Sequence, residues 1–140
     1  MIVNLHWGSE FVAAVTPQQR ALAQRLTRSR AVDAIVGQHA HVVQPIRRVH
    51  RKPVVFGEGN LISNQTSGCC PAAAQDGLIA LLDFVVRPGR PARARRIRYV
   101  PIWVRHPDMT VMRAAPGSPS WNRTVSVAGR RISHPTDGRR

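Results

Sequence analysis

The feature that most constrains the fold of this chain is a helix start that lies between two short apolar runs. Thr16-Pro17-Gln18-Gln19 combines an N-cap residue, a proline suited to the first helical position and a glutamine that completes a capping box. We expect a helix from Thr16 to Arg30. The flanking runs, Ile2–Leu5 and Ala34–Val36, have the length and apolar character of buried strands. Together the three segments predict a βαβ unit with parallel neighbouring strands.

Three further strands are expected after this unit. They are Val54–Phe56, Leu78–Val86 and Arg95–Val104, and the turn residues Pro88–Pro91 allow the last two to pair antiparallel. Beyond Arg105 the chain is rich in Pro, Gly, Ser and Arg, so we expect irregular structure there. The fold class is therefore α/β, with one domain over residues 1–128 and a flexible basic tail over residues 129–140.

The composition narrows the possible partners. The net charge is +14, yet 20 of the 21 basic residues are arginine and only 5% of all residues are aromatic. Scattered arginines without interleaved aromatic side chains make nucleic-acid binding improbable and favour an anionic polymer or a phosphate-like ligand. No apolar run approaches the roughly 20 residues that span a bilayer. Cys69 and Cys70 are adjacent, so we expect two unpaired loop cysteines with no special role.

Three histidines follow the two strands of the βαβ unit. His6 ends the first strand, and His39 and His41 lie just after the second. Imidazole is a common metal ligand, and the carboxyl ends of parallel strands are where α/β sheets place their sites. In an extended loop His39 and His41 would point to opposite sides, where they could reach two neighbouring ions. A pair of ordinary surface histidines is the alternative, and the pattern alone leaves it open.

Several segments, taken in order, resemble the motifs of CapA-type proteins, a bacterial family of capsule and poly-γ-glutamate synthesis. These segments are Leu5–Glu10, Thr16–Arg20, Gly37–Pro45, Lys52–Phe56 and Gly59–Ile62. The resemblance implies a four-layer metallophosphoesterase-like sandwich, with His6, His39 and His41 as ligands of a divalent metal ion. It places Asn60 and Glu10 next to the site without a role. It also implies membrane-associated synthesis partners and a location at the cell envelope.

The chain departs from the family pattern in what precedes its first strand. The early aspartate and the Asn-His motif of the family have no counterpart, so we expect a C-terminal portion, with the N-terminal half missing and an incomplete metal site. Three neutral imidazoles can hold one divalent ion but lack the carboxylate that would bridge two. Glu10 and Glu58 are the first candidates for such a carboxylate. The expected function is a CapA-like role in capsule or poly-γ-glutamate synthesis or export. The alternatives are a metal-dependent phosphoesterase or related hydrolase, and a non-catalytic remnant or anion-binding module.

Overall fold

The first half of the chain forms a mixed four-stranded sheet. In the computed structural model, which describes residues 1–131 and 134–136, the strands are β1 (Ile2–His6), β2 (Ala34–Gln38), β3 (Ile46–Val49) and β4 (Lys52–Val55). Their order is β1-β2-β4-β3, with β1, β2 and β4 parallel and β3 antiparallel to β4. The predicted parallel pairing of the first two strands is confirmed.

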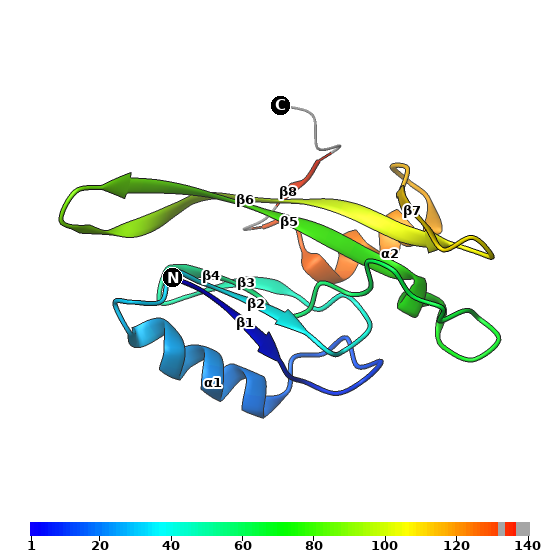
Figure 1. Ribbon diagram of the computed structural model, residues 1–140, viewed down its shortest axis with the longest axis horizontal. Helices are drawn as coiled ribbons and strands as arrows, with labels where there is room; N and C mark the ends of the chain where they lie inside the picture. Colours follow the sequence, from blue (N-terminus) through cyan, green and yellow to red (C-terminus); the bar gives the residue numbers. More distant parts are fainter. Residues whose placement is uncertain (132–133, 137–140) are drawn as a thin grey trace.

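Helix α1 (Pro17–Arg28) covers one face of this sheet (Figure 1). The capping box is present, because the Gln19 amide donates to Thr16 Oγ1 at 3.2 Å and the Thr16 amide donates to Gln19 Oε1 at 2.9 Å. The helix ends two residues before the predicted Arg30. Its buried face contributes Ala23 to an apolar cluster whose other members are Trp7, Val32, Ile35, Val54 and Phe56.

A long hairpin dominates the second sheet. β5 (Asp76–Arg87) and β6 (Arg90–Arg105) pair antiparallel around the predicted turn, and β7 (Thr110–Arg113) and β8 (His134–Pro135) pair with β6. A short 3-10 helix, η1 (Ala72–Gln75), leads into β5. Figure 1 shows the hairpin lying across the first sheet on the side away from α1.

The main core lies between the two sheets. Helix α2 (Pro119–Ala128) contributes to it beside β5 and β6. The buried members are Val43, Ile46, Val55, Leu78, Ile97, Tyr99, Val125 and Ala128. The molecule is thus an α/β fold with two sheets, as predicted, while the four-layer metallophosphoesterase-like sandwich stays a prediction.

Several sequence-based expectations were wrong. β3 was not predicted, and the segment beyond Arg105 is not irregular, since it contains β7 and α2. Helix α2 begins with Ser118 as N-cap and Pro119 in its first turn. Cys69 and Cys70 form a disulfide with each other, in a turn whose Thr66 carbonyl accepts hydrogen bonds from both cysteine amides. Of the expected flexible tail at 129–140, residues 132–133 and 137–140 lie outside the described residues, and its flexibility stays a prediction.

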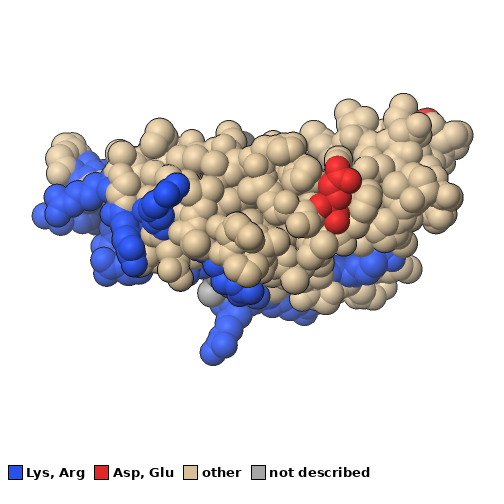
Figure 2. Space-filling model, turned by 90° about the horizontal axis from the view of Figure 1, so that it is seen from below, with Lys and Arg blue, Asp and Glu red and all other residues tan. Residues whose placement is uncertain are grey.

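The two edges of the first sheet differ in character. β1 forms one edge and carries no charged side chain, whereas β3 forms the other and carries Arg47 and Arg48. Basic side chains gather most densely at the end of the molecule where the β5–β6 turn lies, and acidic side chains form a separate patch on the same face (Figure 2). Within the described ranges, neither helix has the length and apolar character needed to cross a membrane.

Candidate functional site

The three predicted histidines come together at the carboxyl ends of β1 and β2. His6 is the last residue of β1 and lies opposite Gln38 at the end of β2. The ring centroids of His6 and His39 are 4.3 Å apart, and those of His39 and His41 are 6.5 Å apart. The predicted convergence of the histidine rings is confirmed, and it follows from the parallel pairing of the two strands.

The backbone of the His39–His41 loop is not extended, which corrects our expectation that the two side chains point to opposite sides. His39 has a φ of 97° and His41 a φ of 56°, both in the left-handed region that non-glycine residues seldom adopt. Between them Ala40 is buried, and its carbonyl accepts a hydrogen bond from the Phe11 amide at 2.7 Å. This anchored backbone directs both imidazole rings into one cavity.

The cavity has a volume of about 480 Å³ and opens between the first sheet and the start of β5. Imidazole, amide and carboxylate groups line it together with apolar side chains. Its lining residues are His6, Gln38, His39, His41, Glu58, Gly59, Asn60, Leu61, Leu78 and Ile79.

Asn60 orients His41. Its Oδ1 lies 2.9 Å from His41 Nδ1, so the amide oxygen accepts a hydrogen bond from the N–H at Nδ1 and the lone pair of the ring is left on Nε2. The Asn60 amide nitrogen donates to the Ala74 carbonyl at 2.8 Å and to Gln65 Oε1 at 2.9 Å. Asn60 was expected near the site without a role. Its contacts instead hold the His41 imidazole in one orientation.

Glu58 is the only carboxylate that lines the cavity in the described part of the chain. Its backbone is held from both sheets, because its amide donates to the Gly37 carbonyl at 3.2 Å and its carbonyl accepts from the Leu78 amide at 2.8 Å. Burial raises the pKa of the Glu58 carboxyl, and a hydrogen bond from the Gln38 side chain partly opposes that rise. Glu10, the other suspected carboxylate, is exposed and does not line the cavity.

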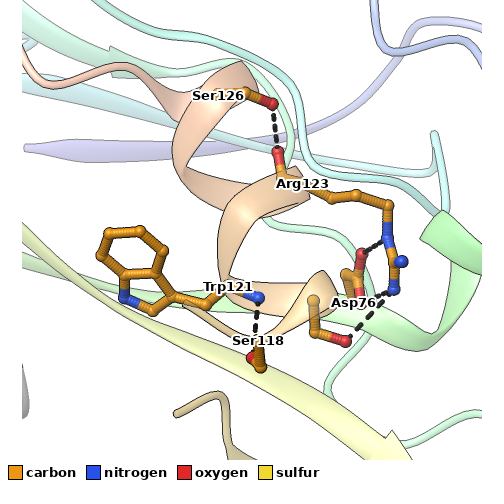
Figure 3. Close-up of polar contacts among 6 residues, drawn as sticks. Asp76, Ser118, Trp121, Arg123 and Ser126 are labelled. Atoms are coloured by element: carbon orange, nitrogen blue, oxygen red, sulfur yellow. Dashed lines mark hydrogen bonds and ion pairs between the residues drawn. The ribbon is translucent and has the colours of Figure 1, made fainter. Parts of the chain in front are cut away.

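The loop that carries Glu58 and Asn60 is tied to helix α2 through an ion pair. Asp76, almost completely buried at the start of β5, accepts from Arg123 Nε at 2.6 Å and from Nη2 at 3.0 Å (Figure 3). The backbone carbonyl of Asp76 also accepts a hydrogen bond from the backbone N–H of Asn60 at 3.2 Å. The bidentate ion pair therefore fixes the first residue of β5, and the loop that carries Glu58 and Asn60 is hydrogen-bonded to that residue.

Gly37 in β2 allows the Phe56 backbone and the Trp7 indole to lie close to the strand just before the histidine loop. A Cβ at this position would lie 2.0 Å from the Phe56 carbonyl oxygen and 2.1 Å from Trp7 Nε1. The same two groups are joined by a hydrogen bond of 2.8 Å, donated by the Trp7 indole. Only glycine permits this approach.

The imidazole and carboxylate side chains of the cavity are of the types that bind a divalent metal ion. Their positions, however, are not those of ligands around a single ion. Two imidazoles that bind one zinc ion have ring centroids about 5 Å apart, since each nitrogen lies about 2.0–2.1 Å from the metal. The observed separations of 4.3 and 6.5 Å bracket this value. However, in residues 1–131 and 134–136 no group of three or more His, Cys, Asp or Glu is arranged to hold an ion. Metal ligation by His6, His39 and His41 stays a prediction.

Comparison with known proteins finds similarity over the segment that forms most of this site. Residues 1–65 match the family described as "Bacterial capsule synthesis protein PGA_cap". The "Capsule biosynthesis protein CapA" of Bacillus anthracis is 35% identical over 65 residues, which are 46% of this chain and 16% of that protein. The "PGA biosynthesis protein CapA" of Bacillus subtilis (strain 168) is 34% identical over 65 residues, 46% of this chain and 17% of that protein. The aligned segment thus spans about a sixth of the length of these relatives.

Proposed function

We propose that this chain acts in the synthesis of a capsule-type glutamate polymer, with the histidine cavity as its functional site, because residues 1–65 are similar to capsule synthesis proteins. One observation carries the proposal. Eight of the ten residues that line the cavity fall inside the matched segment, and only Leu78 and Ile79 lie outside it. The similarity and the cavity therefore concern the same part of the molecule.

The cavity is proposed to hold a single divalent ion. His6, His39 and His41 would supply imidazole nitrogens, with Nε2 as the free donor of His41, and Glu58 would supply a carboxylate oxygen. A bound ion would supply positive charge that attracts and polarises an anionic group of the polymer or its precursor. Asn60 would keep the His41 ring in place as a ligand.

The cellular setting is proposed on the names of the relatives. Proteins named for capsule biosynthesis favour a location at the cell envelope and partners that are membrane-associated synthesis proteins. Truncation of the chain and incompleteness of its metal site remain predictions from the sequence.

The two alternative functions are not favoured. A phosphoesterase of the expected type uses two ions about 3.5–4 Å apart, and the cavity presents only one carboxylate among the described residues to offset their charge. A non-catalytic anion-binding remnant would not need an imidazole oriented by a buried asparagine. Phosphodiester hydrolysis by the purified chain would restore the first alternative.

A chimera tests the proposed role directly. Residues 1–65 would replace the aligned segment of the Bacillus subtilis relative, in a polymer-producing strain that lacks its own copy. We expect polymer production with the unmodified segment and its loss with His39→Ala, because the His39 ring lies 4.3 Å from the His6 ring and 6.5 Å from the His41 ring in the cavity. Equal production with and without His39 would contradict the proposal.

A titration of the purified chain tests the metal site. We expect one zinc or manganese ion per chain by calorimetry, with binding weakened at least about tenfold in His39→Ala and His41→Ala. His134→Ala is the matched control, since His134 is exposed on β8 and does not line the cavity. Two ions per chain, or equal weakening by His134→Ala, would refute the assignment.

A further inference from the structure

A second cavity lies at the opposite end of the first sheet from the histidines. It has a volume of about 560 Å³ and opens where the loop before β2, the β3–β4 turn and the first residues of β6 meet. We call it the arginine groove. Its lining residues are Arg30, Asp33, Arg48, His50, Arg51, Lys52, Arg90, Pro91, Ala92, Arg93 and Ala94.

The groove carries a large excess of positive charge. Five arginines and one lysine face a single carboxylate, Asp33, which is already paired with the N-terminal amine. Within the described residues none of the six cationic side chains belongs to an ion pair. The basic end of the molecule in Figure 2 is the end at which this groove lies. Uncompensated charge in a concave site attracts an anion from solution.

Two of the cations are fixed in place by backbone carbonyls. Arg48 donates to the carbonyls of Arg51 at 3.0 Å, Ala94 at 3.3 Å and Arg95 at 3.4 Å, which ties the β3–β4 turn to β6. Lys52 donates to the carbonyl of Ser29 after helix α1. The groove is therefore held together by its own basic residues, and the exposed arginines project from a defined frame.

The β3–β4 turn also has an unusual composition. His50 and Arg51 form a two-residue hairpin turn with φ values of 46° and 67°, a conformation for which Asn-Gly is strongly preferred. Left-handed backbone at a non-glycine residue costs about 1–2 kcal/mol. Thr27 Oγ1 lies 2.9 Å from His50 Nδ1 and fastens the turn to α1. The turn thus presents a basic side chain to the groove at the expense of backbone strain.

The lining chemistry distinguishes among anionic ligands. The groove contains no Phe, Tyr or Trp on which a nucleic-acid base could stack. Guanidinium groups match carboxylates with paired hydrogen bonds. Several arginines spread along one groove favour an extended ligand that presents many anionic groups over a single small anion. These features are separate from the histidine cavity in both position and chemistry.

We propose that the arginine groove binds a linear polycarboxylate, namely a glutamate polymer. The carboxylate chemistry and the identity of the polymer rest on the proposed function, whereas the preference for an extended polyanion rests on the groove itself. Arg51 and Arg93 are assigned as direct ligands, because their side chains are exposed and make no hydrogen bond or ion pair within the described residues.

Binding of a glutamate polymer of defined length to the full chain tests this proposal. Fluorescence anisotropy would be measured with EDTA present, so that failure here is independent of the metal site and of the chimera. We expect Arg51→Gln/Arg93→Gln to weaken binding at least about tenfold, the loss of two charge-assisted contacts. The control Arg20→Gln/Arg113→Gln removes the same charge away from the groove and should change affinity less than about twofold.

Three results would overturn the proposal. They are absence of polymer binding by the unmodified chain, equal weakening by both double variants, and tighter binding of polyphosphate or single-stranded DNA than of the glutamate polymer. If the groove variant does not fold, side-chain NMR of the unmodified chain gives the answer. The Nε–Hε signals of Arg51 and Arg93 should shift on addition of polymer and that of Arg113 should not, and the reverse pattern would refute the assignment.

Discussion

Replacement of Gly37 by alanine should strongly destabilise the chain. The added Cβ would lie 2.0 Å from the Phe56 carbonyl oxygen and 2.1 Å from Trp7 Nε1, whereas real Cβ contacts essentially never fall below 3.0 Å. One of the two partners is backbone and the other is a buried ring, so about 1 Å of movement must be absorbed inside the core. Overpacking costs about 1–3 kcal/mol, and disruption of the buried Trp7–Phe56 hydrogen bond costs about 1–3 kcal/mol. We therefore expect a loss of about 2–6 kcal/mol in the free energy of unfolding.

Urea denaturation followed by tryptophan fluorescence and circular dichroism measures this loss. With a slope of about 2 kcal/mol per molar urea, the midpoint should fall by about 1–3 M. Gly68→Ala is the matched control, because its Cβ would meet only Thr66 Oγ1 at 3.5 Å, an ordinary contact. It should stay within about 0.5 kcal/mol of the unmodified chain. Equal stability of Gly37→Ala and Gly68→Ala would refute the close approach of β2 to Phe56 and Trp7.

Three other changes have defined outcomes. Arg123→Ala leaves the buried Asp76 carboxylate unpaired, so the free energy of unfolding, measured in urea, should fall by about 2–3 kcal/mol. This loss is smaller than that for a fully buried ion pair, because Arg123 is partly exposed. Asn60→Ala removes the acceptor for His41, so calorimetric zinc affinity should fall about tenfold or more, and an unchanged affinity would exclude the orienting role. Because burial raises the pKa of Glu58, the folded state retains the proton over a pH range above the ordinary carboxyl pKa, where the unfolded state has lost it. Unfolding free energy should therefore fall as pH rises through that range. Glu58→Gln should show a smaller fall, and an identical pH profile would contradict the burial of this carboxylate.

The βαβ unit was predictable because its signals are local. The capping box of α1 and the two short apolar runs lie within 36 residues, and the structure has the helix and both strands where they were expected. β3 escaped prediction because Arg47 and Arg48 interrupt its apolar pattern, and it is stabilised by pairing with β4. Helix α2 did have a signal in Ser118-Pro119, but the Pro- and Gly-rich composition around it suggested irregular structure.

The histidines of the candidate site were predictable for a different reason from its other members. Parallel pairing brings the ends of β1 and β2 together, so the proximity of His6 to His39 follows from topology. The position of Glu58 in the cavity depends instead on backbone contacts with Leu78 in the second sheet. The left-handed conformation of His39 and His41 has only a weak residue-type signal, because histidine is enriched at positive φ but adopts it far less often than glycine.

The unequal edges of the first sheet bear on how the chain behaves at high concentration. At the β3 edge, Arg47 and Arg48 repel the same edge of a second molecule, which is a common protection against strand-to-strand association. The β1 edge offers unpaired backbone groups with no charged side chain over Ile2–His6. Self-association should therefore begin at β1 during concentration for crystallisation or NMR, and a lysine at the exposed Asn4 is the substitution that would keep samples dispersed.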